Sequence, residues 1–428
     1  MGRGLGYAML AINCAFLLLI GYFAKKQIKT ADDFMVAGRR VKWPLISGSI
    51  VITWAWASTV LAAGEATYKY GWPAVWLYPI SGLGLIVAAP FFAKIRKTLT
   101  GGATFTQYVK LRFGSRVHKV MVFVGLFTNL ILFMYLLTGL GWGYSPLFGL
   151  TYWEGVVYGG ITVMLFVMLG GLWSSVMADY FQYLILWISM AIALIYGIKY
   201  IGGMGQLFDS LSKLGIQQNY AIYTKYSLYD YGLVLLFGWI TYAVSDQTMW
   251  QRAYAIEDPK DTKKTFVAGW VSWSLLPAMG ALIALIGMSI GVEAKAGSDI
   301  MANIITVIAP DWVKIAWSFL VFNAIASTFG SVLVGTASII INDIYKSYFT
   351  KGKKIDDKKM IKLNKITILI LGVVAILISL KPGSLLTIGI YLSGFLIVNG
   401  LPILMTYFIS NMNRNSVFWA VIFAFISN

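Results

Sequence analysis

Charged residues, cysteine and histidine are all scarce in this sequence. Only 12% of the 428 residues are charged, whereas 59% are hydrophobic. Apolar side chains therefore far outnumber those that a soluble core could bury, so the chain must meet lipid. Cys14 is the one cysteine, which excludes an internal disulfide. His118 is the one histidine, which leaves little scope for a zinc site or a catalytic imidazole. The sequence predicts an all-α polytopic membrane protein.

Catalytic motifs are missing as well. The sequence contains no nucleophile–base pair, phosphate-binding loop or metal-ligand cluster. The glycines of "GGATF", residues 101–105, most simply turn the chain. We therefore expect neither an enzyme nor a resident cofactor.

Long apolar runs fill most of the chain. A helix needs roughly 17–25 mainly apolar residues to cross a bilayer, and a scan for such runs gives eleven spans. They lie near 5–23, 44–66, 73–93, 118–139, 153–170, 177–201, 231–249, 266–291, 312–341, 366–380 and 384–409. A twelfth run, "SVFWAVIFAFISN", begins near Ser416 and stops after 13 residues. Because this run is too short to cross, we expect that the chain ends inside a helix.

Basic residues cluster on alternate connections between these spans. When the connections are assigned in turn to two sides, 26 of the 34 Lys and Arg residues fall on one side. The positive-inside rule makes that side cytoplasmic and puts the N-terminus outside. The net charge of +17 then needs no nucleic acid, and we expect a multi-pass protein of the cell membrane. The first span lacks a basic leader and a cleavage site, so we expect it to be retained.

Two spans, 44–66 and 231–249, interrupt their apolar runs with hydroxyls, tryptophan or glycine, and a carboxylate. They lie five spans apart, so the second enters the membrane from the opposite side, as an inverted-topology repeat requires. In such transporters the two corresponding helices are locally broken and build the site near the midplane. We predict one transmembrane domain over residues 1–428, with these parts: a peripheral helix near 5–23, repeats near 44–201 and 231–409, and a partial last helix near 416–428.

The first of these spans contains "VITWAWASTVLAAGEATYKYG", residues 51–71. Trp54 and Trp56 lie roughly 15–18 Å into the helix, near the centre of a ~30 Å hydrocarbon core. They either pack between helices or wall a polar pocket, in which an indole N–H donates and its face covers a planar or cationic solute. The hydroxyls of Ser58 and Thr59 allow the same two interpretations.

The span at 312–341 carries small and polar residues on one helical face, namely Ser327, Ser331, Gly335 and Ser338. Close helix packing explains that face. The adjacent Ser327 and Thr328 allow a second interpretation, because two hydroxyls and the carbonyls of a broken helix can bind a dehydrated Na⁺ without a buried fixed charge.

Three carboxylates lie within predicted spans: Glu65, Asp179 and Asp246. An ionisable group inside a bilayer is costly and indicates a functional role. Asp179 and Asp246 lie near predicted cytoplasmic ends, and Glu65 lies near the outer end of its span. Each can instead cap a helix or pair with a neighbour, as Asp246 can with Arg252. The sequence assigns no role to Glu65.

Four motifs, in their order along the chain, resemble those of the sodium/solute symporters: "DDFMVAGRRVKWP", "GGLWSSVMADYFQ", "DQTMWQRAYA" and "STFGSVLVGTASIIINDIYK". The similarity runs from about residue 30 to 346. Three stretches are most similar to the urea and polyamine branch: "TWAWASTVLAAGEATYKYG", "GGATFTQYVKLRFGSRVHKVMVFVGLFTNLI" and "VSDQTMWQRAYA". Gln251 and Arg252 instead follow the general family. The resemblance implies a leucine-transporter-like 5+5 inverted repeat after one extra N-terminal helix, with about twelve helices in all.

The resemblance also implies site residues at matching positions. The implied Na⁺ ligands are the hydroxyls of Ser327 and Thr328 and the carbonyls of Ile52, Ala55 and Ala324. The implied solute-binding side chains are those of Trp56, Thr59, Tyr78, Trp239 and Tyr242. Asp179 matches an aspartate on the cytoplasmic exit path of the ion, and Asp246 matches a position of variable type; both are assigned to ion exit or gating.

These features predict a secondary active symporter that imports a small polar organic solute with Na⁺ by alternating access. Urea or a related amide or amine is the expected solute, and the lipid bilayer is the other partner. Coupling to H⁺ stays open, as does another solute such as an amino acid or a monocarboxylate; the intact hydroxyl pair favours Na⁺. Two alternatives of other classes are the membrane half of a sensor histidine kinase and a passive solute channel.

Overall fold

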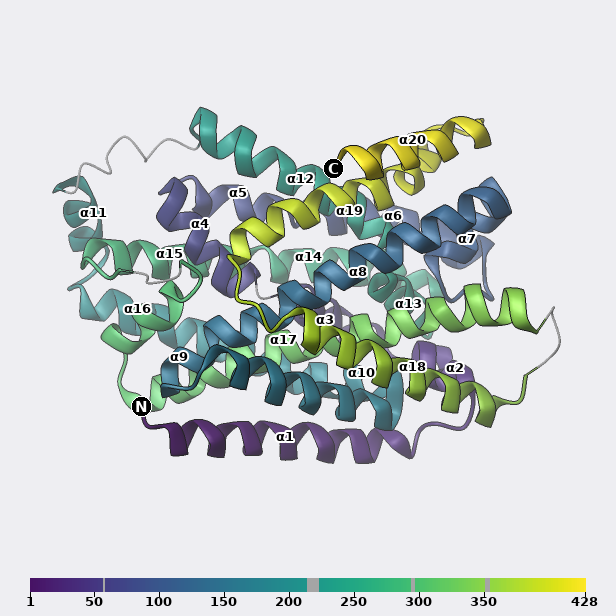
Figure 1. Ribbon diagram of the computed structural model, residues 1–428. Coiled ribbons are helices and arrows are strands. Elements are labelled where there is room, and N and C mark those ends of the chain that lie inside the picture. The colour runs from purple at the N-terminus through teal and green to yellow at the C-terminus, as the bar shows by residue number, and fades with distance from the viewer. Residues whose placement is uncertain (57, 214–222, 294–296, 351–354) are drawn as a thin grey trace.

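The computed structural model describes residues 1–428 except 57, 214–222, 294–296 and 351–354 (Figure 1). The described chain is almost entirely helical, as the sequence predicts. The α-helices are α1 (Arg3–Lys25), α2 (Ala31–Val36), α3 (Trp43–Trp54), α4 (Ala63–Tyr70), α5 (Ala74–Ile80), α6 (Leu83–Thr98), α7 (Phe105–Phe113), α8 (Ser115–Gly143), α9 (Ser145–Phe148), α10 (Tyr152–Tyr200), α11 (Met204–Lys213), α12 (Leu233–Ser245), α13 (Gln247–Ala255), α14 (Thr262–Trp273), α15 (Leu275–Ser289), α16 (Ile300–Ile308), α17 (Asp311–Ile339), α18 (Asp357–Ile378), α19 (Leu385–Phe408) and α20 (Arg414–Ser427). Short π-helical segments are η2 (Ser58–Ala62), η4 (Ser227–Gly232) and η6 (Ile340–Phe349).

Helix α10 contains two membrane spans. Its 49 residues would measure about 74 Å as one straight helix, more than twice the ~30 Å of a hydrocarbon core. Helical geometry fails at Gly170 and Gly171. Gly171 has a φ of 54°, and an added Cβ there would collide with the Phe34 carbonyl oxygen, so glycine is required at this tight turn.

Contacts with α1 show that the two halves of α10 run in opposite directions. Ring pairs join Tyr7 to Tyr158 and, farther along α1, Phe16 to Phe181, with centroid distances of 6.2 and 6.1 Å. The turn between the halves packs against Ala24, near the end of α1. The first half therefore runs alongside α1 in the same direction, and the second half returns.

The number of complete spans agrees with the prediction. Nine helices in the described ranges are long and apolar enough to cross a membrane, and α3 with α4 forms a tenth span that is bent by 58°. Counting α10 as two spans gives the eleven that were predicted. The last helix, α20, has 14 residues, or about 21 Å, which is too short to cross. That the chain ends inside a helix stays a prediction.

Both spans that were predicted to be broken are interrupted. Helix α3 ends at Trp54, and Ala55 leaves the helical region with φ −76° and ψ 58°. Helix α12 ends at Ser245, and Asp246 is extended before α13 begins. The division of the chain into two repeats stays a prediction.

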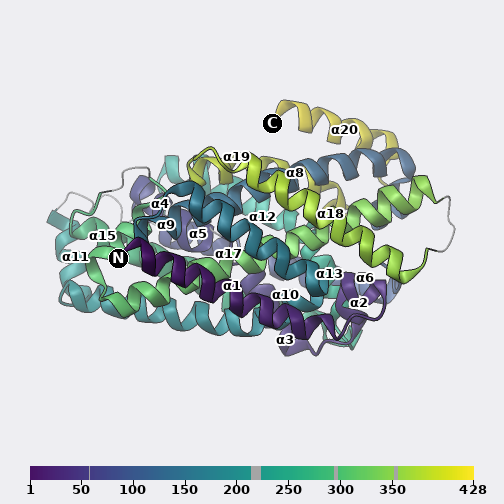
Figure 2. The ribbon, with the colours of Figure 1, turned by 60° about the horizontal axis from the view of Figure 1, so that its bottom comes forward.

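Helix α17 lies at the centre of the bundle and is its most buried span. It packs against both α10 and α8. Helix α1 lies along the bottom of the bundle in Figure 1 and crosses its front in Figure 2. At the opposite edge, α20 lies over α8 and α19. The helix that carries Ser327 and Thr328 is thus shielded from lipid by its neighbours.

The connections that were assigned to the cytoplasm meet at one end of the bundle, on the right in Figure 1. Arg39 donates to the carbonyl of Thr100, and the Val41 N–H donates to the carbonyl of Ala255. The Ala31 N–H donates to Asp357 at the start of α18. The alternation of the connections is therefore confirmed, whereas the orientation in the membrane, with the N-terminus outside, stays a prediction.

Candidate ion and solute site

The end of α3 lies against α17 at the hydroxyl pair. Thr328 Oγ1 lies 2.7 Å from the Thr53 carbonyl oxygen and 3.2 Å from that of Ala324. The Thr53 hydroxyl lies 3.4 Å from Ser327 Oγ. The Ala55 N–H donates to the carbonyls of Val51 and Ile52, which closes the last turn of α3.

These contacts bring the implied Na⁺ ligands to one buried place. Ser327, Thr328 and Ala324 share a face of α17, and Ile52 and Ala55 belong to the turn of α3 that meets it. Thr53, which supplies both contacts to the hydroxyl pair, was not predicted from the sequence. Its position between two predicted carbonyl ligands was the available signal.

Asp179 pairs with Arg252 and not with solvent. Arg252 Nη2 donates to Asp179 Oδ2 at 2.9 Å, and both side chains are fully buried. Ser327 donates to the other carboxylate oxygen at 2.6 Å, and Ser49 donates to Oδ2 as well. The alternative that Arg252 pairs with Asp246 is therefore wrong. Asp179 instead connects the ion-site helix to the guanidinium.

A ladder of polar contacts joins the second half of α10 to α17. Its three rungs are Ser175 with Ser331 at 2.7 Å, Asp179 with Ser327 at 2.6 Å, and Gln182 with Asn323 at 3.2 Å. A further hydrogen bond of 2.9 Å links Asn323 to Asn13 of α1. Four of these residues were not predicted from the sequence: Ser175, Gln182, Asn323 and Asn13. The spacing of 175, 179 and 182, which puts all three on one helical face, was the signal.

The predicted small face of α17 also serves close packing. A Cβ added at Gly335 would lie 3.0 Å from Gln247 Cγ, and Ser338 donates to the carbonyl of Val334. The close-packing interpretation therefore applies to part of this face, and the binding of Na⁺ by Ser327 and Thr328 stays a prediction. Gly335 and Ser338 allow close packing, whereas Ser327 and Ser331 belong to the ladder.

Asp246 occupies the break between α12 and α13. One carboxylate oxygen accepts from Trp54 Nε1 at 2.9 Å, and the other accepts from the Thr248 N–H at 2.8 Å as the N-cap of α13. The packing interpretation of Trp54 therefore holds, because its ring packs against Trp239 and Trp273. Its N–H donates to a protein carboxylate, and Trp54 does not line the cavity. The bond joins the two interrupted spans directly.

Four of the five implied solute-binding residues form one aromatic cluster. The ring centroid of Trp56 lies 4.5 Å from that of Trp239 and 5.5 Å from that of Tyr242. Trp56, Trp239 and Tyr78 line one cavity. Tyr242 belongs to the cluster but does not line the cavity. Thr59 does not line it either: its hydroxyl donates to the Trp54 carbonyl at 3.4 Å. Nothing is described for the Ser58 side chain.

The cavity beside Trp56 is nearly filled. It leaves about 10 Å³ for the centres of water-sized molecules, which is room for about one water. Tyr135 and Ser393 also line it, and the other residues around it are apolar or glycine. Aromatic side chains must therefore move before a solute can enter.

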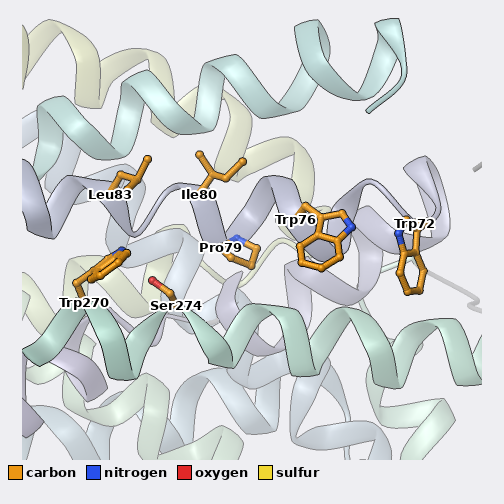
Figure 3. A pocket seen from close by; sticks show the side chains of 7 residues that line it. All are labelled: Trp72, Trp76, Pro79, Ile80, Leu83, Trp270 and Ser274. Carbon is orange, nitrogen blue, oxygen red and sulfur yellow. The ribbon is translucent and has the colours of Figure 1, made fainter. Parts of the chain in front are cut away.

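A larger groove lies beside α5, α6 and α14. It is lined by Trp72, Trp76, Pro79, Ile80, Leu83, Trp270 and Ser274 (Figure 3). Trp76 is 47% exposed, whereas Tyr78, two residues along, is buried and lines the inner cavity. The groove therefore lies on the other side of α5 and does not belong to the solute cavity.

At the end of the bundle that was assigned to the cytoplasm, Asp343 holds α7 and α8 against the extension of α17. Its carboxylate accepts from the hydroxyls of Thr104 at 2.9 Å and Thr106 at 2.7 Å. His118 Nε2 lies 2.9 Å from the same carboxylate. The one histidine is therefore a buried partner of Asp343, which suits a structural role.

Comparison with known proteins identifies the family. Residues 34–424, most of the chain, match the profile of the sodium:solute symporter family. This chain is a sodium:solute symporter family member. Probable urea active transporter 3 of Schizosaccharomyces pombe is 25% identical to it over 83% of this chain and 58% of that protein. The osmoregulated proline transporter OpuE of Bacillus subtilis is 24% identical over 97% of this chain and 86% of that protein.

The fold of this family member agrees with a solved structure. A Na⁺-coupled sialic acid symporter, solved in a substrate-bound outward-open state, superposes with a TM-score of 0.76 over 92% of this chain and 86% of that chain, at 19% identity. The fold is leucine-transporter-like, as predicted. The chain spans little more than half the length of the urea transporters that it matches.

Proposed function

We propose that this chain carries out Na⁺-coupled symport of a small neutral solute, with urea as the first candidate. The observation that carries the proposal is the contact between the break after α3 and the hydroxyl pair of α17, where Thr328 Oγ1 lies 2.7 Å from the Thr53 carbonyl. Hydroxyl and carbonyl oxygens are the ligands that a hard cation prefers. The C-terminal end of α3 adds a partial negative charge at the same place.

This geometry supports a direct coupling between ion and solute. Na⁺ bound by the carbonyls of Ile52 and Ala55 and by the groups on α17 would fix the backbone at the break. Trp56, one residue beyond Ala55, lines the solute cavity. Ion binding would therefore order the side chain that contacts the solute, and separation of α3 from α17 would release both.

The cavity favours a neutral solute over an amine. None of the described residues that line it is charged, and an ammonium group buried there without a partner would be costly. Asp246, the buried carboxylate of the neighbouring break, already accepts from Trp54 and Thr248. Urea carries amide groups without net charge, and its planar shape suits the faces of Trp56 and Trp239.

A second candidate solute is an amino acid such as proline. It is favoured by the similarity to a proline transporter over 97% of this chain and 86% of that protein. A zwitterion needs partners for both of its charges. The break after α3, together with a bound Na⁺, would have to supply the partner for the carboxylate.

Uptake by protein reconstituted into vesicles tests both the solute and the ion. Labelled urea, proline, putrescine and acetate are each measured under an imposed Na⁺ or H⁺ gradient. We expect urea uptake that is driven by Na⁺. The double variant, Ser327→Ala with Thr328→Ala, is expected to lower this uptake at least about tenfold, because it removes two of the proposed ligands. Uptake that is indifferent to both gradients would indicate a channel. Uptake driven by H⁺ alone, or unchanged in the double variant, would refute the Na⁺ site.

The solute assignment has its own variants. Trp56→Ala and Tyr242→Ala are expected to raise the urea concentration required for half-maximal uptake, because each removes a ring of the aromatic cluster. Trp312→Ala is the matched control, because Trp312 is 51% exposed at the start of α17 and belongs neither to the cavity nor to the aromatic cluster around Trp56. Equal urea dependence in all three variants would remove the cavity from the solute path.

A further inference from the structure

Glu65 joins three elements at the end of the bundle that was assigned to the outside. It belongs to α4, the half of the bent span beyond the break. Ser384 Oγ donates to one carboxylate oxygen at 2.6 Å, and Ser298 Oγ donates to the other at 2.7 Å. The Leu386 N–H also donates to Glu65, at 3.1 Å. One carboxylate thus accepts hydrogen bonds from residues more than 200 positions away in sequence.

The partners of Glu65 are themselves held in place. Ser384 is the N-cap of α19 and accepts from the Thr387 N–H at 3.1 Å. Ser298 accepts from the Leu385 N–H at 2.9 Å. The carboxylate therefore lies at the N-terminal end of α19, where the helix dipole favours a negative charge.

Glycine brings the segment before α16 close to the carboxylate. Gly297 has a φ of 74°, and a Cβ added there would lie 3.3 Å from Glu65 Oε1. Two further contacts run alongside: the Tyr68 hydroxyl donates to the Val292 carbonyl at 2.9 Å, and the rings of Tyr70 and Tyr231 stack 5.2 Å apart. Helix α4 is thus held at this end by hydrogen bonds and a ring contact to several other segments.

We propose that Glu65 is a positioning residue that holds the outer end of the solute path closed. Glu65 lies nine residues beyond Trp56, and Ser393 of α19 lines the same cavity as Trp56. Helix α4 also contacts α19, so a route from this end that runs between these two helices would be closed where they meet. The hydrogen bonds of Glu65 join these two helices, so they keep the route shut.

The chemistry of these bonds suits a contact that opens and closes. Charge-assisted hydrogen bonds are strong, and a carboxylate that accepts from hydroxyls and one backbone N–H is well satisfied when closed. When α4 moves away, water can replace the three donors and solvate the carboxylate. Closure and opening therefore differ by a modest free energy, as alternating access requires. This proposal goes beyond the proposed function, because it does not depend on which solute or ion is carried.

A single reporter cysteine measures the closure. Cys14→Ser removes the native thiol, and Ser393→Cys places one in the cavity, where the residue is 1% exposed. The protein is labelled in vesicles with a membrane-impermeant thiol reagent, applied to one side at a time and without solute. Glu65→Gln keeps the shape but removes the charge, and we expect about tenfold faster labelling from one side alone. Glu293→Gln is the matched control, an exposed glutamate at the same end, and its labelling rate is expected to stay unchanged.

Variants of the donors test the same contact if Glu65→Gln folds poorly. Ser384→Ala and Ser298→Ala each remove one hydroxyl donor and leave the carboxylate, so each is expected to raise the rate about threefold from that same side. An unchanged rate in Ser384→Ala and Ser298→Ala would overturn the proposal. An equal rise in Glu293→Gln would also overturn it, because a general charge effect would then explain the result. A failure of Na⁺-driven uptake would leave this readout unaffected.

Discussion

Replacement of Arg252 and Asp179 together is expected to destabilise the protein by less than the two single replacements add up to. The two side chains are fully buried, with 2.9 Å between Nη2 and Oδ2. At an effective dielectric constant of about 20, unit charges at that distance attract by about 6 kcal/mol. The desolvation of each ion costs several kcal/mol, so the intact pair contributes little net stability.

A single replacement leaves one charge buried without its partner. Arg252→Gln is therefore expected to lower the free energy of unfolding by about 3–5 kcal/mol, and Asp179→Asn by a similar amount. The double variant is expected to lose at least about 2 kcal/mol less than the two single variants add up to, because no bare charge remains. Ser49 and Ser331, which also contact Arg252, can hydrogen-bond the amides.

Unfolding by SDS in mixed micelles, followed by tryptophan fluorescence, measures the free energy of unfolding. It is applied to the unchanged protein, the two single variants and the double variant. Arg112→Gln is the matched control, because Arg112 lies in α7 at the surface and donates to backbone carbonyls of 409 and 410. Its effect is expected to stay below about 1 kcal/mol. Additive losses in the double variant would refute the reasoning, since they would mean that the two charges do not stabilise each other.

Three further expectations follow from single contacts. Gly171→Ala is expected to lower stability by at least about 1–3 kcal/mol in a thermal assay, because φ is 54° and the added Cβ meets a carbonyl oxygen; Gly101→Ala, with open space around it, is the control. Trp54→Phe removes the indole donor to Asp246 and is expected to cost about 1.5–3 kcal/mol, and an unchanged melting temperature would contradict that. Asp343→Asn is expected to speed hydrogen exchange in residues 105–113, because the carboxylate that holds α7 loses its charge; unchanged protection would count against it.

Several features of the fold followed from local properties of the sequence. Apolar runs gave the number of complete spans because a bilayer demands a minimum helix length wherever a helix crosses. Basic residues identified which connections share an end because charges stay out of the hydrocarbon core. Interrupted runs marked the two broken spans, and the adjacent hydroxyls Ser327 and Thr328 marked the helix that faces one of the breaks. Each of these signals is contained within a single segment.

The partners of the buried charges could not be read in this way. Nearness in sequence offered Asp246 as one possible partner of Arg252, but the fold turns the Arg252 guanidinium toward Asp179 of another helix. Thr59 was expected in the solute cavity, but its hydroxyl satisfies the Trp54 carbonyl, which the break leaves without a helical partner. The spacing of residues along the chain predicts which side chains share a helical face. It does not predict which helix packs against that face.

The sequence by itself determined that this protein is a membrane-spanning helical bundle with two interrupted spans and a polar face on one central helix. The tertiary structure alone decided that Asp179 connects Ser327 to Arg252, that Asp246 joins the two breaks through Trp54, and that Glu65 meets the start of α19. The physical reason is that the residue type alone shows that a charge is costly to bury and needs partners. The groups that offset this cost come from distant segments, which only the packing of the helices brings together.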